Sequence, residues 1–115
     1  MRLPNVEQAV VAPRKVVEYL LSRTNPRSQN KAAYFEALGY SPDNWGVLAD
    51  ALLAHANSHE IADRDDTPFG TWYTIEGEFE APRGNRPRIR TVWFVDIGNR
   101  IPRFVTAYPL PRSAS

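Results

Sequence analysis

"RTVWFVDIGNRIPRFVTAYP", residues 90–109, is the stretch of sequence that decides the fold. Apolar and polar side chains alternate on both sides of "GNRIP", which predicts two antiparallel strands joined by a short turn. The same alternation in "TWYTIEGEFE" (residues 71–80) predicts a strand before them, and "HEIAD" (residues 59–63) is a candidate for a short edge strand. "DDTPFG" (residues 65–70) has the composition of a turn.

The N-terminal half predicts three helices, over residues 13–22, 28–38 and 41–57. Gly39 suits the end of the second, and Pro42 suits the first turn of the third. Helices followed by strands indicate an α+β fold, with about three N-terminal helices on one face of a C-terminal antiparallel sheet of about four strands, a meander. The length of 115 residues favours one domain over residues 1–110, with a disordered tail at 111–115.

Charge suggests a register for the central hairpin. If Glu80 lies opposite Arg88, then Glu78 meets Arg90, and opposite charges pair across the strands. This register places Ile75 opposite Trp93 on the other face.

The last strand is expected to place Val105 beside Val95. The helices would then cover one face of the sheet and leave the other open. The open face is predicted to carry Trp72, Thr74, Glu76, Glu78, Arg88, Arg90, Phe94, Phe104, Thr106 and Tyr108.

Composition excludes some functions and locates the charge. The chain has no cysteine, so disulfides and thiolate chemistry are impossible, and a reducing cytoplasm is the expected location. Neither a secretory signal nor an apolar run long enough to cross a membrane is predicted. The net charge is only +1, yet residues 59–80 hold seven acids against one arginine, and residues 83–103 hold six arginines against one acid.

The basic segment has two interpretations. Arg83, Arg86 and Arg88 can form a phosphate-binding rim, in which case Arg83, Arg86 and Arg100 should lack carboxylate partners. Alternatively, the arginines and the acids of the neighbouring strand neutralise one another as surface pairs.

Few residues suggest catalysis by spacing alone. His55 and His59 are one helical turn apart, but no third ligand can be identified, so no metal site and no cofactor are predicted. Histidine is the side chain that most often serves as a general base near neutral pH, so His59 is a candidate for that role. Lys31 begins a helix, where a cation is unfavourable unless an anion lies nearby or the ammonium simply reaches water.

The stretches "VEYLLSRTNPRSQNKAAYF", "LGYSPDNWGVLADALLAHA" and "RTVWFVDIGNRIPRFVTAYP" together resemble a family of small uncharacterised bacterial domains of unknown function. More distantly, the order of helices and sheet and the closing "FVTAYP" resemble the barnase–EndoU–colicin–RelE group of RNase toxins. The second resemblance implies metal-independent RNA cleavage on the open face of the sheet, with Arg90, Thr106 and Tyr108 there and Lys31 supplied by the helical half.

Two hypotheses follow. In the first, the chain is a toxin-like ribonuclease or a degenerate relative: Arg90 clamps phosphate, Thr106 bonds it, Tyr108 orients a base, Lys31 stabilises charge and His59 is the base. Phe94 would join the three rim arginines in binding substrate. In the second, the chain is a non-catalytic interaction module with an exposed aromatic patch of Trp72, Phe94, Phe104 and Tyr108. The candidate partners are RNA and a cognate immunity or antitoxin protein, with no membrane involved.

Overall fold

The computed structural model describes residues 1–21 and 29–110, and the predicted tail at 111–115 lies outside them. Helical elements come first in the chain. They are the 3-10 helix η1 (Val6–Gln8), the π-helix η2 (Lys15–Leu20), α1 (Gln29–Ala37), the 3-10 helix η3 (Pro42–Asn44) and α2 (Trp45–Ser58). The start of the η3–α2 pair is fixed by Ser41, whose backbone N–H donates to Asn44 Oδ1 at 2.7 Å. Gly39 takes a φ of 108°, so the left-handed position predicted after α1 is confirmed.

Four strands form one antiparallel sheet in the order β1-β2-β3-β4, so the predicted meander is confirmed. The strands are β1 (Ile61–Thr67), β2 (Gly70–Glu78), β3 (Arg88–Asp96) and β4 (Arg103–Pro109). The outer edge of β4 is partly covered by the N-terminal segment, because Val10 forms a parallel bridge with Arg103.

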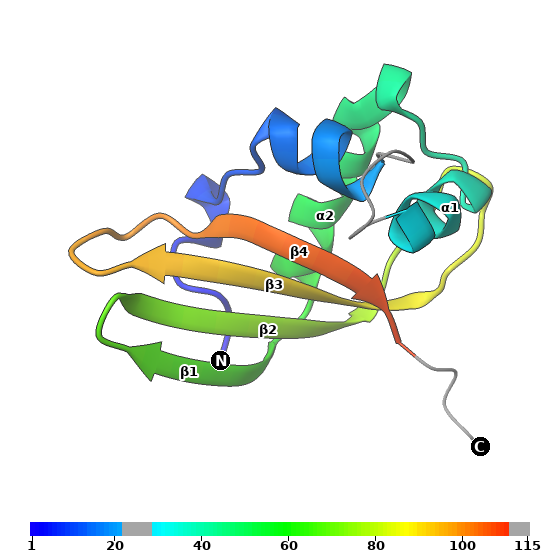
Figure 1. The fold of residues 1–115 in the computed structure, drawn as a ribbon. Helices are drawn as coiled ribbons and strands as arrows, with labels where there is room; N and C mark the ends of the chain where they lie inside the picture. Colours follow the sequence, from blue (N-terminus) through cyan, green and yellow to red (C-terminus); the bar gives the residue numbers. More distant parts are fainter. Residues whose placement is uncertain (22–28, 111–115) are drawn as a thin grey trace.

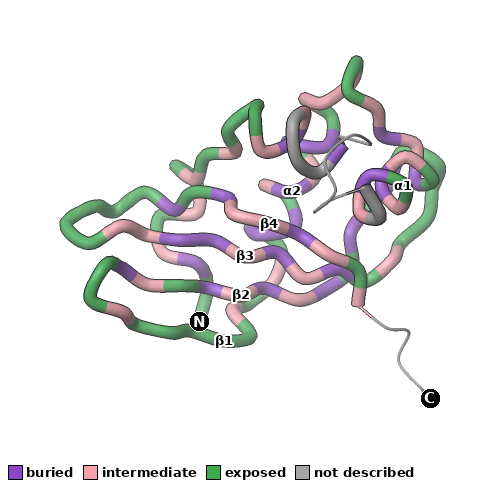
Figure 2. Tube along the Cα trace, viewed as in Figure 1, coloured by how far each residue is buried: buried purple, intermediate pink, exposed green. Residues whose placement is uncertain are grey.

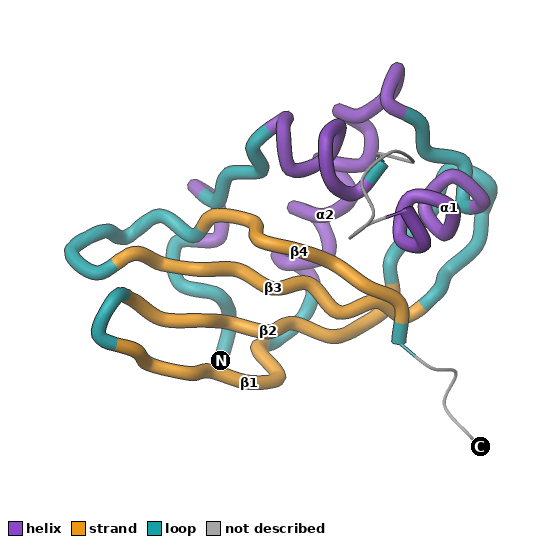
Figure 3. Tube along the Cα trace, in the orientation of Figure 1, coloured by secondary structure: helices purple, strands orange, loops and turns teal. Residues whose placement is uncertain are grey.

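The helices lie on one side of the sheet, and the core lies between the two layers (Figures 1 and 3). Along the strands, buried residues alternate with more exposed ones, as period-two patterning requires (Figure 2). Trp93 is fully buried and packs edge-on against Phe104, with ring centroids 5.5 Å apart. Other large core residues include Phe35, Tyr40, Leu48, Leu52, Ile75, Phe79 and Ile89.

The prediction of three N-terminal α-helices is wrong in detail. Within the described residues, the α-helices are α1 and α2 only, and both lie in the middle of the chain. Residues 13–22 were expected to form an α-helix, but Lys15–Leu20 is a single stretch of π-helix in which Leu21 N–H bonds the Val16 carbonyl at 2.8 Å. This wider turn still buries Val16 and Leu21, so the apolar pattern is satisfied without an α-helix.

The register of the central hairpin differs from the predicted one by two residues. Glu76 pairs with Arg90 and Glu78 with Arg88, and Tyr73 rather than Ile75 lies opposite Trp93. A shift of two keeps every side chain on its predicted face, because side chains in a strand alternate with a period of two.

The predicted position of Val105 beside Val95 is also wrong. Trp93 pairs with Phe104 and Val92 with Thr106, so Val105 is an extra residue in a β-bulge. The bulge turns Phe104 into the core, where it is 2 % exposed, although it was predicted on the open face.

The first turn is shorter than "DDTPFG" indicated. Strand β1 continues to Thr67, whose side-chain hydroxyl donates to the Gly70 carbonyl at 2.8 Å and accepts from Phe69 N–H at 3.2 Å. Among residues 1–21 and 29–110, no helix has the length and apolar character that crossing a membrane requires.

Candidate functional site

Strand pairing places a polar row across the open face of the sheet. Glu76 on β2 pairs with Arg90 on β3, and Arg90 pairs with Tyr108 on β4. Paired residues point to the same face, so the three side chains lie side by side. All three are half-buried, which leaves them accessible from solvent.

Lys31 reaches this row from α1, past the β4 edge of the sheet. Its Nζ donates to Thr106 Oγ1 at 2.8 Å and lies 5.5 Å from the centroid of the Tyr108 ring. The neighbouring cation, Arg90, lies 5.4 Å from the same centroid. Two cations therefore contact one aromatic ring, and Lys31, Glu76, Arg90, Thr106 and Tyr108 are called the polar cluster below.

Arg90 is held from two sides. Its Nε donates to Glu76 Oε2 at 2.6 Å, its Nη2 contacts the same oxygen, and its Nη1 donates to the Tyr108 hydroxyl at 3.2 Å. The bond to Tyr108, followed by the bond to Glu76, raises the pKa of Arg90 above its ordinary value, so the guanidinium stays charged. No residue in the described part of the chain hydrogen-bonds Glu76 Oε1, so the carboxylate keeps one oxygen for another partner.

His59 lies apart from the polar cluster, on the helix-covered side of the sheet. Its ring packs over Gly77, where an added Cβ would come within 2.6 Å of it, and its Nε2 lies 2.8 Å from the Glu78 carbonyl oxygen. The structure therefore does not bring His59 to Arg90, Thr106 and Tyr108.

The arginines of the predicted rim also spread out. Arg83 lies against Gly39 at the end of α1, and Arg86 lines a groove of about 640 Å³ between α2 and the β2–β3 loop. Arg88 is exposed and pairs with Glu78 in the sheet. Within residues 1–21 and 29–110, Arg83, Arg86 and Arg100 form no ion pair, which is the arrangement expected of a rim. Of the rim arginines, however, only Arg88 lies on the strand of Arg90.

The aromatic patch of the interaction hypothesis is not present as predicted. Phe94 is 5 % exposed and Phe104 is turned into the core. Phe94 is covered by Trp72, whose ring centroid lies 4.6 Å away, and by Arg103, whose guanidinium lies 5.1 Å from the ring. Trp72 itself remains 37 % exposed on the open face.

His55 belongs to a buried hydrogen-bond chain that the sequence did not reveal. Trp93 Nε1 donates to Thr91 Oγ1 at 2.9 Å, the Thr91 hydroxyl donates to His55 Nδ1 at 3.2 Å, and His55 Nε2 donates to the Gly77 carbonyl at 3.2 Å. The Gly77 carbonyl can only accept, so His55 Nε2 carries a hydrogen, and in the neutral ring Nδ1 is the acceptor for the Thr91 hydroxyl. Burial, and then the charge of His59, lowers the pKa of His55 to about 4.

Two features of the polar cluster were not predicted from the sequence: a role for Glu76, and the contact between Lys31 and Thr106. Glu76 was placed on the open face only as one of several acids, and no pattern in the sequence connects Lys31 with Thr106, 75 positions away. No group of three or more His, Cys, Asp or Glu side chains suited to a metal ion occurs among the described residues.

Comparison with solved structures gives a likeness of fold. A chain of the contact-dependent growth inhibition toxin–immunity protein complex from Klebsiella pneumoniae 342 is 21 % identical and superposes with a TM-score of 0.71, over 92 % of this chain and 97 % of that one. No curated protein sequence matches. Residues 2–111 match a family described as a domain of unknown function (DUF6883), and the chain belongs to this family.

Proposed function

We propose that this domain is a toxin-like, metal-independent ribonuclease that cleaves RNA phosphodiesters at the polar cluster. The observation that carries the proposal is the meeting of two cations, a carboxylate and two hydroxyl groups on the uncovered face of the sheet. The fold likeness to a chain of a toxin–immunity complex supports a toxin-related role. The proposal extends the sequence hypothesis by adding Glu76 and placing the base there instead of at His59.

The chemistry divides among the five side chains. Glu76 accepts the proton of the ribose 2′-hydroxyl, whose oxygen attacks the adjacent phosphorus. Lys31 and Arg90 stabilise the negative charge that develops on the phosphoryl oxygens, and Thr106 contributes a hydroxyl beside them. The bond from phosphorus to the 5′-oxygen breaks, and the Tyr108 hydroxyl donates the proton that the leaving oxygen needs. The products are a 2′,3′-cyclic phosphate and a 5′-hydroxyl.

The test is cleavage of tRNA and of total RNA by the purified domain in the presence of EDTA, with the 3′ ends of the products analysed for cyclic phosphate. Lys31→Ala and Arg90→Ala should each lower the rate roughly 10²- to 10³-fold. Glu76→Gln should lower it by at least about 100-fold, because the amide cannot accept the proton.

Two matched variants serve as controls. Lys15→Ala removes the only other lysine, and Arg64→Ala removes a strand arginine that lies over Tyr73 and is paired with Asp66. Both should cleave at the wild-type rate. Absence of cleavage by the folded wild-type domain, or equal loss in the controls, contradicts the proposal.

A second candidate function is binding to a cognate immunity protein, and a specific surface favours it. Phe69 and Ile97, at the tips of the two hairpins, are 78 % and 72 % exposed, and Ile97 N–H donates to the Phe69 carbonyl at 2.9 Å. Two large apolar side chains held together at the surface are typical of a protein contact.

This binding can be tested with the product of the neighbouring gene. If that product is the partner, the two proteins should co-elute in size-exclusion chromatography. Phe69→Asp combined with Ile97→Asp should separate them, and Val47→Asp on α2 should not. A complex unaffected by the double variant would place the interface elsewhere.

A further inference from the structure

Trp72 is an exposed aromatic residue on the same face as the polar cluster, and neither hypothesis above gives it a role in catalysis. We infer that Trp72, supported by Phe94, is a nucleobase subsite that stacks one base of single-stranded RNA next to the phosphate held at the cluster. This inference rests on the proposed function, because it takes RNA as the ligand of the open face.

The contacts beneath Trp72 support its ring against Phe94. Its ring lies 4.6 Å from that of Phe94, centroid to centroid, at a tilt of 60°, so the two rings are in direct contact and Phe94 supports Trp72 from below. Phe94 can approach β2 only because Gly70 has no side chain, since a Cβ there would lie 2.5 Å from Phe94 Cζ.

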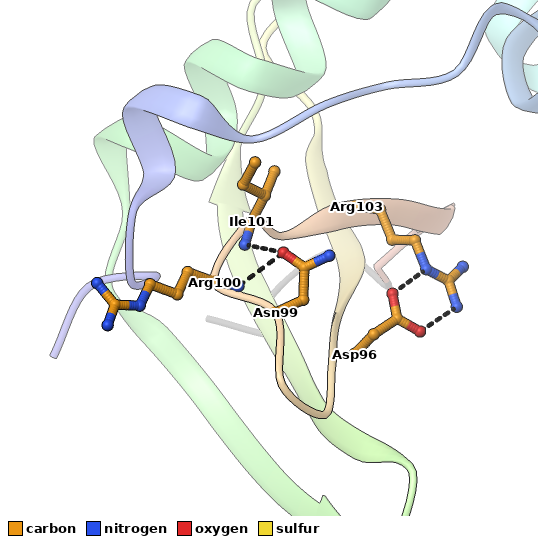
Figure 4. A network of polar contacts seen from close by, with 5 residues as sticks. All are labelled: Asp96, Asn99, Arg100, Ile101 and Arg103. Carbon is orange, nitrogen blue, oxygen red and sulfur yellow. Dashed lines mark hydrogen bonds and ion pairs between the residues drawn. The ribbon is translucent and has the colours of Figure 1, made fainter.

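Arg103 also contacts the Phe94 ring. It lies 5.1 Å from the Phe94 ring and is held by Asp96, with Nε–Oδ2 at 2.9 Å and Nη2–Oδ1 at 3.3 Å (Figure 4). In the same turn, Asn99 Oδ1 accepts the N–H groups of Arg100 and Ile101, which orders the loop that joins β3 to β4 (Figure 4). Trp72 therefore rests on a Phe94 ring that is itself contacted by the ion-paired Arg103.

Register sets the distance between the platform and the cluster. Trp72 precedes Thr74 and Glu76 on the same face of β2, and Thr74 lies in the row of Val92 and Thr106. Same-face neighbours in a strand are about 7 Å apart, so Trp72 lies roughly 7 Å from the Thr106 row and 13 Å from the Arg90 row. A nucleotide attached to a phosphate at the cluster can reach across this interval.

The distribution of charge on the open face determines how a bound RNA is oriented. Lys31, Arg90 and Arg103 lie on the β3–β4 side, whereas Asp63 and Asp65 pair with β2 residues of the same face. Phosphates are drawn to the first side and repelled from the second, so the bases point towards β2, where Trp72 lies. A base must leave its helix to stack there, which favours single strands over duplexes.

Binding is measured with a short 2′-O-methyl RNA, which lacks the 2′-hydroxyl and cannot be cleaved. Single-stranded oligonucleotide should quench the tryptophan fluorescence of the wild-type domain and of Trp45→Phe, but not of Trp72→Phe. Trp72→Ala should bind roughly tenfold more weakly, whereas Trp72→Phe should stay within about threefold because it keeps an aromatic face. The same oligonucleotide in a duplex should bind more weakly than the single strand and show no dependence on Trp72.

The outcomes separate this inference from the proposed function. Wild-type affinity in Trp72→Ala, or quenching that persists in Trp72→Phe, overturns the subsite even if the domain cleaves RNA. Binding that depends on Trp72, without cleavage of unmodified RNA, supports the subsite and overturns the ribonuclease activity. Absence of any binding overturns both. Circular dichroism of each variant confirms that the fold is retained.

Discussion

At the scale of single residues, burial determines which side chains can contact a ligand and which only stabilise the fold. His55 and His59 are one turn apart on the chain, yet His55 is sealed in a hydrogen-bond chain while His59 covers Gly77. Lys31 and Glu76 are half-buried and contact groups that can face a ligand. Sequence spacing alone could not separate these cases, because it contains no information about which polar atoms form hydrogen bonds with one another.

His55 should make the stability of the domain depend on pH. Its folded pKa of about 4 lies below the ordinary histidine pKa of 6.5, so the unfolded chain binds more protons between these values and stability falls as pH falls from about 6.5 to 4. The full loss is roughly 3 kcal/mol. Urea unfolding at pH 7 and pH 4.5 should show wild-type losing about 2 to 3 kcal/mol more than His55→Gln.

His59→Gln is the control for this measurement, because burial rather than the charge of His59 is the larger cause of the shift. It should retain most of the wild-type pH dependence. If His55→Gln and wild-type have parallel stability profiles, the buried neutral histidine is not the titrating group.

At the scale of secondary-structure elements, local patterns predict elements well and their alignment poorly. Ser41 and Pro42 mark the start of η3–α2, and alternation marks β2 to β4, because both signals depend on neighbouring residues. The two-residue register shift was not predictable, since Glu76 and Glu78 both offer Arg90 a carboxylate on the same face. The bulge at Val105 has no local signal, and it determines which face Phe104 takes.

The same distinction applies to the candidate site. Alternation alone places Arg90, Thr106 and Tyr108 on the open face, as the structure does. The contact of Lys31 with Thr106 depends on where the tertiary structure places α1 relative to β4, which no short pattern encodes. Phe94 was correctly placed on the open face, but its burial follows from Trp72 and Arg103, which only tertiary structure brings over it.

The β1–β2 hairpin depends on Gly70. This residue has a φ of 151°, and a Cβ would lie 2.3 Å from the Val95 carbonyl oxygen, so Gly70→Ala meets both backbone strain and a backbone clash. We expect a loss of about 2 to 4 kcal/mol in the free energy of unfolding. Gly98→Ala in the β3–β4 turn has a φ of 78° but open space around it, and should cost only about 1 kcal/mol. Equal losses in chemical denaturation would show that the close approach of Phe94 and Val95 contributes nothing.

At the scale of the whole molecule, the positive and negative charges nearly cancel in total but lie on different parts of the sheet. A net charge of +1 gives little general attraction to nucleic acid, so RNA binding has to come from the local cations of the open face. The acids of β1 and β2 confine that attraction to the β3–β4 side. The two candidate functions therefore differ in how they should respond to salt.

Salt titration of RNA binding measures how many phosphates the open face neutralises. If Lys31 and Arg90 each contact one phosphate, the logarithm of the association constant for a single-stranded 2′-O-methyl RNA should fall against log salt with a slope of about −1.4. Arg90→Ala should reduce the slope by about 0.7, because one fewer counterion is released. Trp72→Ala should lower the affinity and leave the slope unchanged, because stacking involves no ion release. A slope near zero for wild-type would exclude phosphate contact by the polar cluster. A slope that Arg90→Ala leaves unchanged would assign the phosphate contacts to other cations. The exposed Arg83 and Arg86 would be the first of these to test.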